Sequence, residues 1–338
     1  MDDMPHKMVF VGATGHSHLV LGELEHYSQL RYVACAPSYP GEDLGRIEYV
    51  DADGHTPQVY DDWRIMLDRE TPDIVVVCGR HDTNGPIAIE AAQRGCHIIA
   101  EKPAGHSLDE IATLRRLVAE KGLTYASMLA MRYEAPFYTA HQLVRQGLVG
   151  EPYLVAAQKS YRWGVRPDWY GRRSTYGSTM TWVGIHAFDY ARWVAGVEYT
   201  SVCAYHANLG HPERPGCQDV ATVMAGLHNG GSALFNLDYL RPEAASTHGD
   251  DRLRIAGSAG VLEICDCGSR LHVITDEKDT PSWPLQDPGR TLLGDFVAAL
   301  EDRGDLLAPA EEAFSIAEFA VRATQAADER RTISLQTG

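Results

Sequence analysis

The sequence lacks the apolar segments that mark membrane and secreted proteins. No uninterrupted apolar run in its 338 residues approaches the roughly 20 residues that a membrane-spanning helix needs. The opening segment, Met1 to Lys7, carries two aspartates and lacks the basic, apolar and small-residue regions of a secretion signal. These absences predict a cytoplasmic protein that does not bind membranes.

Positive charge is also scarce. The chain has 30 lysines and arginines against 46 aspartates and glutamates, so its net charge is −16. Nucleic acids and anionic membrane surfaces are bound through clusters of lysine and arginine, which are not found in this sequence. The charge balance therefore favours a small-molecule substrate and disfavours a nucleic-acid partner.

Neither a disulfide framework nor a metal-binding pattern is present. The seven cysteines are an odd number without regular spacing, which predicts reduced thiols. Cys265 and Cys267 lack a matching second pair of ligands, and we interpret both as strand residues. His16 and His18 diverge at a helix start and have no third ligand at a suitable spacing. We expect no catalytic metal.

The length exceeds what one core usually supports, and the pattern of elements predicts two domains. Residues 1–128 alternate β-rich and helical stretches, with strands expected at 8–11, 32–36, 58–60, 73–78, 97–100 and 123–128. This pattern is typical of a Rossmann domain, an α/β fold with a doubly wound parallel sheet. Ser107 and Glu110 form a predicted capping box for the helix before the sixth strand.

The pattern changes after residue 128. A helix with Pro136 near its start leads into β-rich runs at 153–160, 200–208, 221–228, 232–239, 253–256 and 261–264. A loop is expected at 276–290 and a closing helix at 310–329. Residues 129–338 are therefore predicted to form an α+β domain that binds substrate on a large, mostly antiparallel open sheet. Because an open sheet face usually needs a cover, we expect a homodimer or larger homo-oligomer.

A glycine turn follows the first predicted strand. Backbone N–H groups at such a turn favour an anion, so it is predicted to hold the pyrophosphate of a dinucleotide. An ordinary tight turn is the alternative, and the position after the first of six strands favours the cofactor. The residues concerned are Gly12, Ala13, Thr14, Gly15, His16 and Ser17.

The end of the second predicted strand bears on the choice between NAD and NADP. The strand ends at Ala36, without the acid that holds an adenine ribose in NAD enzymes, which favours NADP. Ser38 and Arg46 are then candidates for the 2′-phosphate of NADP. A capped turn and a solvated arginine are the alternative reading of these two residues.

Residues 95–103, Gly-Cys-His-Ile-Ile-Ala-Glu-Lys-Pro, resemble the Gfo/Idh/MocA family (glucose–fructose oxidoreductase, inositol dehydrogenase and rhizopine catabolism), whose fifth strand runs into a Glu-Lys-Pro turn beside the nicotinamide. The resemblance covers nearly the whole chain. It includes residues 60–63, 132–133, 147–152 and 257–260, and residues 184–189 look like the family's GxHxxD helix.

The resemblance implies an NAD(P)-dependent oxidoreductase that transfers a hydride between a nicotinamide and a sugar, cyclitol or related polyol. Lys102 is then expected to contact the cofactor and to stabilise charge on the alcohol oxygen, and His186 to take the alcohol proton. Asp189 is expected to hold a substrate hydroxyl or to orient the imidazole. Glu101 either fixes the turn through backbone hydrogen bonds or contacts the cofactor.

Further contacts are expected in both domains. Gly79, Arg80 and Asn84, after the fourth strand, are candidate cofactor contacts, although the family commonly has Thr-Pro and a histidine there. Candidate substrate contacts are Arg132, Tyr161, Trp163 and Trp182. Trp182 stands where the family usually has an aspartate, which suggests an apolar wall. The aromatic segment 161–173 fits a polyol pocket and a subunit interface equally well.

Two other functions stay open. The missing aspartate and the altered glycine turn allow a ligand-binding or regulatory protein that keeps the fold without hydride transfer. A lyase or glycosidase that oxidises its substrate transiently and retains the cofactor also fits the sequence.

Overall fold

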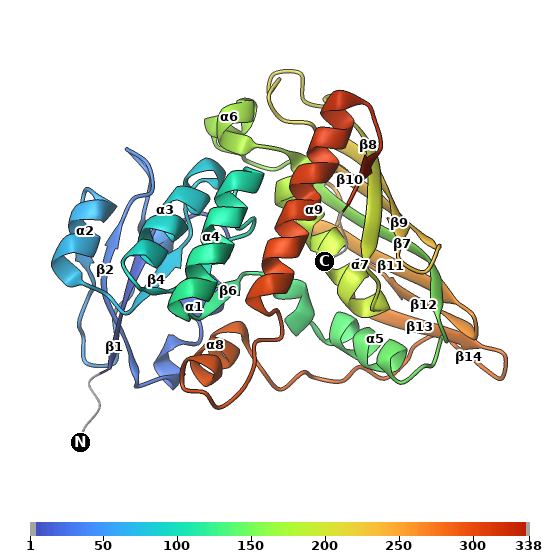
Figure 1. Ribbon diagram of the computed structural model, residues 1–338, viewed down its shortest axis with the longest axis horizontal. Coiled ribbons are helices and arrows are strands. Elements are labelled where there is room, and N and C mark those ends of the chain that lie inside the picture. Colours follow the sequence, from blue (N-terminus) through green and yellow to red (C-terminus); the bar gives the residue numbers. More distant parts are fainter. Residues whose placement is uncertain (1–4, 336–338) are drawn as a thin grey trace. The chain divides into compact units, whose positions relative to one another are not determined.

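The computed structural model describes residues 5–335; residues 1–4, which belong to the opening segment considered in the sequence analysis, and residues 336–338 lie outside the described residues. The chain forms two compact units. Unit 1 contains residues up to Ala130 together with Arg290–Ala317, and unit 2 contains Met131–Gly289 and the residues from Glu318 onward. Helix α9 (Ala310–Glu329), red in Figure 1, runs from unit 1 into unit 2. The functional division at residue 128 stays a prediction.

Unit 1 is built on a six-stranded parallel sheet, which confirms the predicted Rossmann fold. Its strand order is β3-β2-β1-β4-β5-β6, so the order reverses between β1 and β4. Ligands of such sheets bind outside the carboxyl ends of the strands at this reversal. The strands are β1 (His6–Val11), β2 (Leu30–Ala36), β3 (Gln58–Val59), β4 (Ile74–Val77), β5 (His97–Ala100) and β6 (Tyr125–Ser127).

Helices lie against this sheet, with α2 on β2 and α3 on β4 and β5 (Figure 1). The apolar side chains from Met8 to Val11 and from Ile74 to Val77 are completely buried, as expected for central strands of a parallel sheet. The helices of unit 1 are α1 (His18–Leu21), η1 (Leu24–His26), η2 (Gly45–Ile47), α2 (Trp63–Glu70), α3 (His81–Gln93), α4 (Leu108–Lys121) and α8 (Leu292–Leu300).

Side-chain caps explain where two of these helices begin. The Ser107 hydroxyl accepts from the Glu110 N–H at 3.2 Å, which is the first half of the predicted capping box. The Glu110 carboxylate accepts instead from the His106 N–H at 2.8 Å. Asp62 begins α2 by accepting from the N–H groups of Arg64 and Ile65 at 2.7 and 3.2 Å.

Unit 2 is built on a nine-stranded sheet in the order β14-β13-β12-β11-β7-β10-β9-β8-β15. β7 and β10 pair in parallel and the other neighbours pair antiparallel, which confirms the predicted mostly antiparallel sheet. The strands are β7 (Pro152–Arg162), β8 (Tyr199–Ala207), β9 (Val220–Leu227), β10 (Ser232–Arg241), β11 (Gly249–Gly257), β12 (Gly260–Cys265), β13 (Arg270–Thr275), β14 (Asp279–Thr280) and β15 (Ile333–Ser334).

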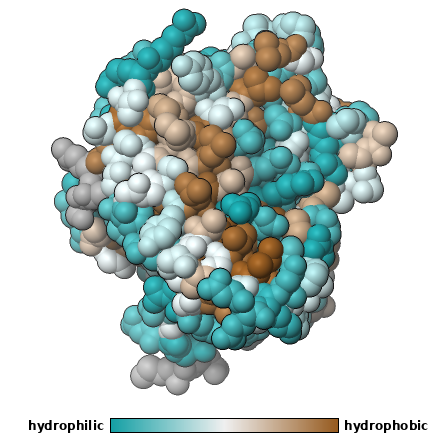
Figure 2. Space-filling view, turned by 90° about the vertical axis from the view of Figure 1, so that its right-hand side faces the viewer, coloured by the Kyte–Doolittle hydropathy of each residue, from teal (hydrophilic) through white to brown (hydrophobic). Residues whose placement is uncertain are grey.

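One face of this sheet is covered and the other is open. Helices α5 (Ala135–Arg145) and α7 (Ile185–Ala195) pack on the covered face, where the rings of Phe188 and Phe235 meet edge to face at 4.9 Å. On the open face Tyr205 and Met224 are 76% and 52% exposed. Figure 2, which views the molecule from the β8–β14 side of Figure 1, shows apolar areas between hydrophilic ones. The shorter helices of unit 2 are η3 (Ala130–Tyr133, at the boundary), η4 (Asp168–Gly171), α6 (Arg173–Tyr176) and η5 (Met180–Gly184).

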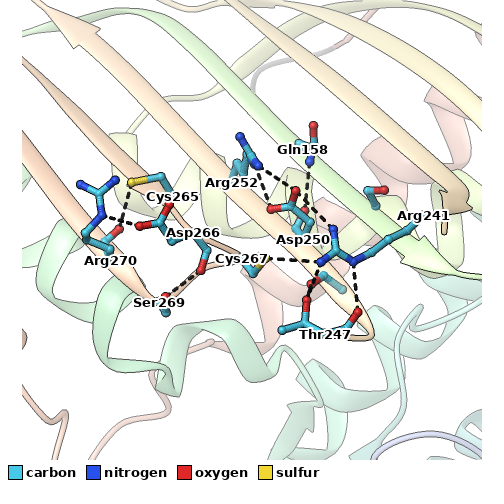
Figure 3. Close-up of polar contacts among 12 residues, drawn as sticks. Gln158, Arg241, Thr247, Asp250, Arg252, Cys265, Asp266, Cys267, Ser269 and Arg270 are labelled. Carbon is cyan, nitrogen blue, oxygen red and sulfur yellow. Dashed lines mark hydrogen bonds and ion pairs between the residues drawn. The ribbon is translucent and has the colours of Figure 1, made fainter. Parts of the chain in front are cut away.

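The turn between β12 and β13 corrects one interpretation. Cys265 ends β12, but Asp266 and Cys267 lie in a left-handed turn with φ of 53° and 59°, so Cys267 is not a strand residue. Its sulfur accepts from Arg241 Nη2 at 3.5 Å (Figure 3). All seven cysteines lie within the described residues and are free thiols. None of the helices in residues 5–335 combines the length and apolarity that crossing a membrane requires.

Candidate functional site

The turn after β1 has a backbone that suits glycine at two positions. Gly12 and Gly15 have φ of 82° and 85°, in the left-handed region. A Cβ atom on Gly12 would lie 2.5 Å from the carbonyl oxygen of Cys78, and one on Gly15 would overlap the carboxylate of Glu101. The Thr14 N–H donates to the Cys78 carbonyl at 2.7 Å. The turn therefore lies against the carboxyl end of β4, at the reversal of strand order.

A carboxylate from the loop after β2 bonds to this turn. Glu42 Oε1 accepts from the Ala13 N–H at 3.0 Å and from the Thr14 hydroxyl at 3.2 Å. Glu42 Oε2 accepts from the N–H and the hydroxyl of Ser38, both at 2.7 Å. The Ser38 hydroxyl in turn accepts from the Arg80 N–H at 3.1 Å. Glu42 thus joins the loops that follow β1 and β2.

Sequence reasoning missed Glu42 because it sought an acid at the end of β2. The loop continues through Pro40 and Gly41, and Gly41 has a φ of 83°. A Pro-Gly pair is a turn signal, and it could have indicated that the loop folds back and returns a later side chain to the strand end.

The loop after β4 contributes a buried amide. The Gly79 N–H donates to Asn84 Oδ1 at 2.8 Å, while Asn84 Nδ2 is buried and has no hydrogen-bond partner within residues 5–335. Arg80 pairs with both oxygens of Asp82 at 2.5 and 2.8 Å, and its guanidinium lies 4.8 Å from the centre of the Tyr39 ring. An unused buried donor beside the strand reversal fits a ligand contact.

Glu101 and Lys102 follow β5 and are completely buried, with 0% and 1% exposed. Glu101 Oε1 accepts from the backbone N–H of His16 and lies 2.6 Å from its Nδ1. Lys102 Nζ lies 3.9 Å from Glu101 Oε2. Burial raises the pKa of Glu101, but the charges of His16 and Lys102 and the bonds to His16 outweigh it, so the pKa is below its usual range. The carboxylate is therefore ionised and holds the glycine turn and the lysine together.

The rest of the turn leads into α1. Ser17 is buried and precedes that one-turn helix without a side-chain cap. Arg46 Nη2 donates to the Gly15 carbonyl at 3.2 Å, so this side chain lies beside the glycine turn. The six predicted turn residues, together with Ser38, Gly79, Arg80, Asn84, Glu101 and Lys102, thus gather around the carboxyl ends of the strands of unit 1.

Three of the residues predicted for unit 2 lie on α7 and on the π-helical turn η5 before it. Trp182 lies in η5, while His186 and Asp189 lie on α7, and all three side chains are buried. A Cβ atom on Gly184 would lie 2.5 Å from Cδ1 of Leu237, so this glycine lets the helix approach β10 closely. π-Helical turns inside helices are frequent at functional sites.

Asp189 and Arg132 bind each other. Arg132 Nη2 donates to Asp189 Oδ1 at 2.6 Å, and its Nε lies 3.1 Å from Oδ2. The guanidinium lies 5.3 Å from the centre of the Trp193 ring, and Trp193 stacks on His141. Both charged side chains are buried. The structure therefore joins two predicted substrate contacts in one buried ion pair, and their role toward a substrate stays a prediction.

The aromatic segment after β7 packs around a guanidinium. Arg166 lies 5.3 and 5.1 Å from the ring centres of Tyr170 and Tyr239, and its Nε donates to the Trp163 carbonyl at 2.7 Å. Burial raises the pKa of Tyr170 to about 12, although Arg166 and a hydrogen bond with Trp182 lower it. Trp182 is thereby connected to this cluster.

Two histidines stack on the same segment. Trp163 stacks on His211 with ring centres 4.0 Å apart, and Tyr161 stacks on His248 at 4.8 Å. Within residues 5–335, no group of three or more histidine, cysteine, aspartate or glutamate side chains could hold a metal ion.

Comparison with known proteins extends over both units. Residues 7–128 match the oxidoreductase family with an NAD-binding Rossmann fold, and residues 137–263 match the GFO/IDH/MocA C-terminal domain. A structure described as an oxidoreductase of Thermotoga maritima is 33% identical, with a TM-score of 0.92, over 97% of this chain and 100% of that one.

Two curated relatives from Bacillus subtilis are more distant. The oxidoreductase YrbE is 28% identical over 64% of this chain, and the match spans 60% of YrbE, less than two thirds of its length. The scyllo-inositol 2-dehydrogenase (NAD⁺) is 26% identical over 73% of this chain and 72% of the relative.

Proposed function

Because the chain belongs to the Gfo/Idh/MocA family of oxidoreductases, with an NAD-binding Rossmann domain, we propose that it transfers a hydride between a nicotinamide dinucleotide and a sugar, cyclitol or related polyol. The observation that carries the proposal is that the buried Glu101 contacts both the buried Lys102 and, through His16, the glycine turn. The named activity of the inositol dehydrogenase relative supports the substrate class.

The residues of unit 1 fit a dinucleotide. Gly12 and Gly15 let the turn lie close against Cys78 and Glu101, and a glycine turn of this kind between a strand and a helix is a typical place for a pyrophosphate. The unused Nδ2 of Asn84 is a donor for the cofactor, and Gly79 and Arg80 flank it. When bound, the nicotinamide supplies the hydride acceptor or donor.

The chain's own residues would handle the proton and the charge. Lys102 donates a hydrogen bond to the oxygen of the reacting alcohol and stabilises the negative charge that develops there, an effect that is strong in a site without water. His186 accepts the hydroxyl proton and returns it in the reverse direction. Glu101, whose Oε2 lies 3.9 Å from Lys102 Nζ, orients the lysine. Asp189, bound to Arg132, supports α7 beside the histidine.

The aromatic cluster of unit 2 supports a polyol substrate. Trp163 and Tyr161 offer flat apolar faces for a sugar or cyclitol ring, and the neighbouring His211, His248 and Arg166 offer polar contacts. Trp182, through its contact with Tyr170, would form an apolar wall where the family usually has an aspartate.

A homo-oligomer is part of the proposal. Several exposed apolar side chains lie on the open face of the nine-stranded sheet. They are Leu154, Tyr205, Met224 and Leu234. A second copy could cover this face, and the molecular mass in solution would reveal it. The predicted cytoplasmic location stays a prediction.

The test of the function begins with the wild-type protein. It is titrated with NAD⁺ and NADP⁺ and then assayed at 340 nm with a panel of sugars and cyclitols. Lys102→Met is expected to lower turnover by about 10² to 10⁴-fold, as for removal of a group that stabilises the transition state, while dinucleotide affinity is retained. Lys121→Met is the matched control, because Lys121 lies exposed at the end of α4. Failure to bind either dinucleotide would overturn the proposal.

A ligand-binding protein without turnover is the second candidate, favoured by Trp182. Its buried indole lies in η5, four residues before the expected proton acceptor His186, and cannot assist proton transfer as a carboxylate does. This candidate predicts polyol binding with no change in nicotinamide absorbance. A lyase or glycosidase would instead release a product without net redox change, so product analysis separates it from the dehydrogenase.

A further inference from the structure

We propose that Glu42 selects NAD over NADP by binding the two hydroxyls of the adenosine ribose. The inference rests on the proposed function, because it concerns the dinucleotide that this function requires. It assigns a specificity role to a residue that lies well beyond the end of β2, where the sequence has no acid.

The position of the carboxylate is the first support. In Rossmann folds an acid near the end of β2 binds the ribose beside the glycine turn. Glu42 reaches this place from the following loop, because its two oxygens accept from the main-chain N–H groups of Ala13 and Ser38 at 3.0 and 2.7 Å. One of these residues follows β1 and the other follows β2, so the carboxylate is fixed between the two strand ends.

The second support is the kind of donors that Glu42 has. An ionised carboxylate accepts about four hydrogen bonds, and Glu42 receives four: two from main-chain N–H groups and two from the hydroxyls of Thr14 and Ser38. The hydroxyls can rotate toward other acceptors, whereas the main-chain donors are fixed. A ribose diol brings two hydroxyl donors. It can therefore replace the two rotatable ones while the main-chain bonds keep the carboxylate in place.

A 2′-phosphate would meet unfavourable partners. It carries about −1.5 to −2 charges near neutral pH and presents acceptors to a carboxylate that needs donors. Ser38, a candidate phosphate contact, already donates both its N–H and its hydroxyl to Glu42. Arg80 is paired through two bonds with Asp82, and Arg46 donates to the Gly15 carbonyl beside the glycine turn. The inference therefore reverses the preference for NADP that the end of β2 suggested.

The experiment measures dissociation constants by calorimetry for NAD⁺, NADP⁺, ADP-ribose and 2′-phospho-ADP-ribose. The last two probes lack the nicotinamide and report on the adenosine half alone. We expect wild type to bind NAD⁺ at least about tenfold more tightly than NADP⁺, and ADP-ribose more tightly than 2′-phospho-ADP-ribose by the same factor. Glu42→Gln is expected to weaken NAD⁺ binding by roughly tenfold to a hundredfold and to reduce the discrimination. Glu48→Gln, the same charge change at an exposed residue nearby, should match wild type.

The possible outcomes separate this inference from the function. Equal or tighter binding of NADP⁺ by wild type would overturn the role of Glu42 and leave the oxidoreductase proposal intact. Unchanged discrimination in Glu42→Gln would do the same. If wild type binds none of the four probes, the proposed function itself fails. Because the wild-type ratio needs no variant, the inference can be overturned even if Glu42→Gln does not fold.

Discussion

Two carboxylates of unit 1 and two of unit 2 are held in contrasting ways. In unit 1, Glu42 is held by main-chain N–H groups and hydroxyls, and Glu101 by the N–H and ring of His16 with Lys102 at 3.9 Å. In unit 2, Asp189 is bound by Arg132, and Asp250 accepts two bonds from Arg252 at 2.9 Å with Arg241 at 3.6 Å (Figure 3).

This difference separates exchangeable contacts from fixed ones. A protein hydroxyl can turn from a carboxylate to another acceptor at little cost in free energy if a ligand hydroxyl takes its place. The reason is that such a hydrogen bond is worth about 1 kcal/mol net. A buried carboxylate that loses its arginine becomes an uncompensated charge, which costs about 3–5 kcal/mol. Glu42 is therefore suited to accept a ligand hydroxyl, whereas the arginine-bound Asp189 and Asp250 are fixed contacts.

The largest expected effect follows from removing the arginine of the buried pair. Arg132→Met leaves Asp189 buried and unpaired, and we expect a loss of about 3–5 kcal/mol in the free energy of unfolding, measured in urea. The double variant Arg132→Met with Asp189→Leu should recover most of this loss, because no buried charge remains.

The matched control is Arg192→Ala. Arg192 pairs with the exposed carboxylate of Glu198 at 2.8 Å, and such a pair is worth about 0–1 kcal/mol. If Arg132→Met cost no more than this control, Asp189 would not depend on the arginine. The contrast between the units would then fail, and Asp189 would be available to a substrate.

An intermediate effect is expected from Glu101. Its pKa is lowered in the folded protein, so its contribution to stability is complete above the ordinary pKa of glutamate and is lost as the pH falls through the lowered value. Glu101→Gln should cost about 1–3 kcal/mol at pH 7 and should make the melting temperature less sensitive to acid. Melting curves between pH 7 and 3 for wild type and variant measure this.

Glu120→Gln controls for the loss of a carboxylate as such. Glu120 pairs with Arg116 on the exposed side of α4. This variant should keep the acid sensitivity of wild type. Equal acid sensitivity in wild type and Glu101→Gln would show that the glycine turn does not depend on the ionised Glu101.

The fold of unit 1 could be predicted more fully than that of unit 2. Parallel strands buried on both faces are continuous apolar runs, such as Ile74–Val77, and they are easily recognised. In unit 2, β13 and β14 were not predicted, because a left-handed turn at Asp266 and Cys267 separates β13 from β12 and β14 is only two residues long. Helix α8 was also missed, since it follows a stretch rich in proline and charge.

The candidate site shows a similar limit. The glycine turn and the Glu-Lys-Pro segment are local patterns, and the sequence places them correctly after β1 and β5. The bond between Arg132 and Asp189 joins residues 57 positions apart, and sequence reasoning assigned each of them to a substrate. Glu42 depends on a loop that folds back to β1. Long-range pairings of this kind follow from tertiary structure, and the local signal for them here is limited to the Pro40-Gly41 turn before Glu42.

The smallest expected effect tests whether every carboxylate on main-chain N–H groups in unit 1 is exchangeable. Asp62 also accepts from two N–H groups, but these belong to the first turn of α2, and the bonds serve as a helix cap. Asp62→Ala should cost about 1 kcal/mol in urea unfolding, and Asp62→Asn much less, because asparagine caps helices about as well as aspartate. Neither change should alter NAD⁺ affinity, in contrast to Glu42→Gln. If Asp62→Ala lost NAD⁺ affinity, a carboxylate bonded only to main-chain N–H groups would also take part in ligand binding. The rotatable hydroxyls of Thr14 and Ser38 would then not explain why Glu42 is suited to a ligand.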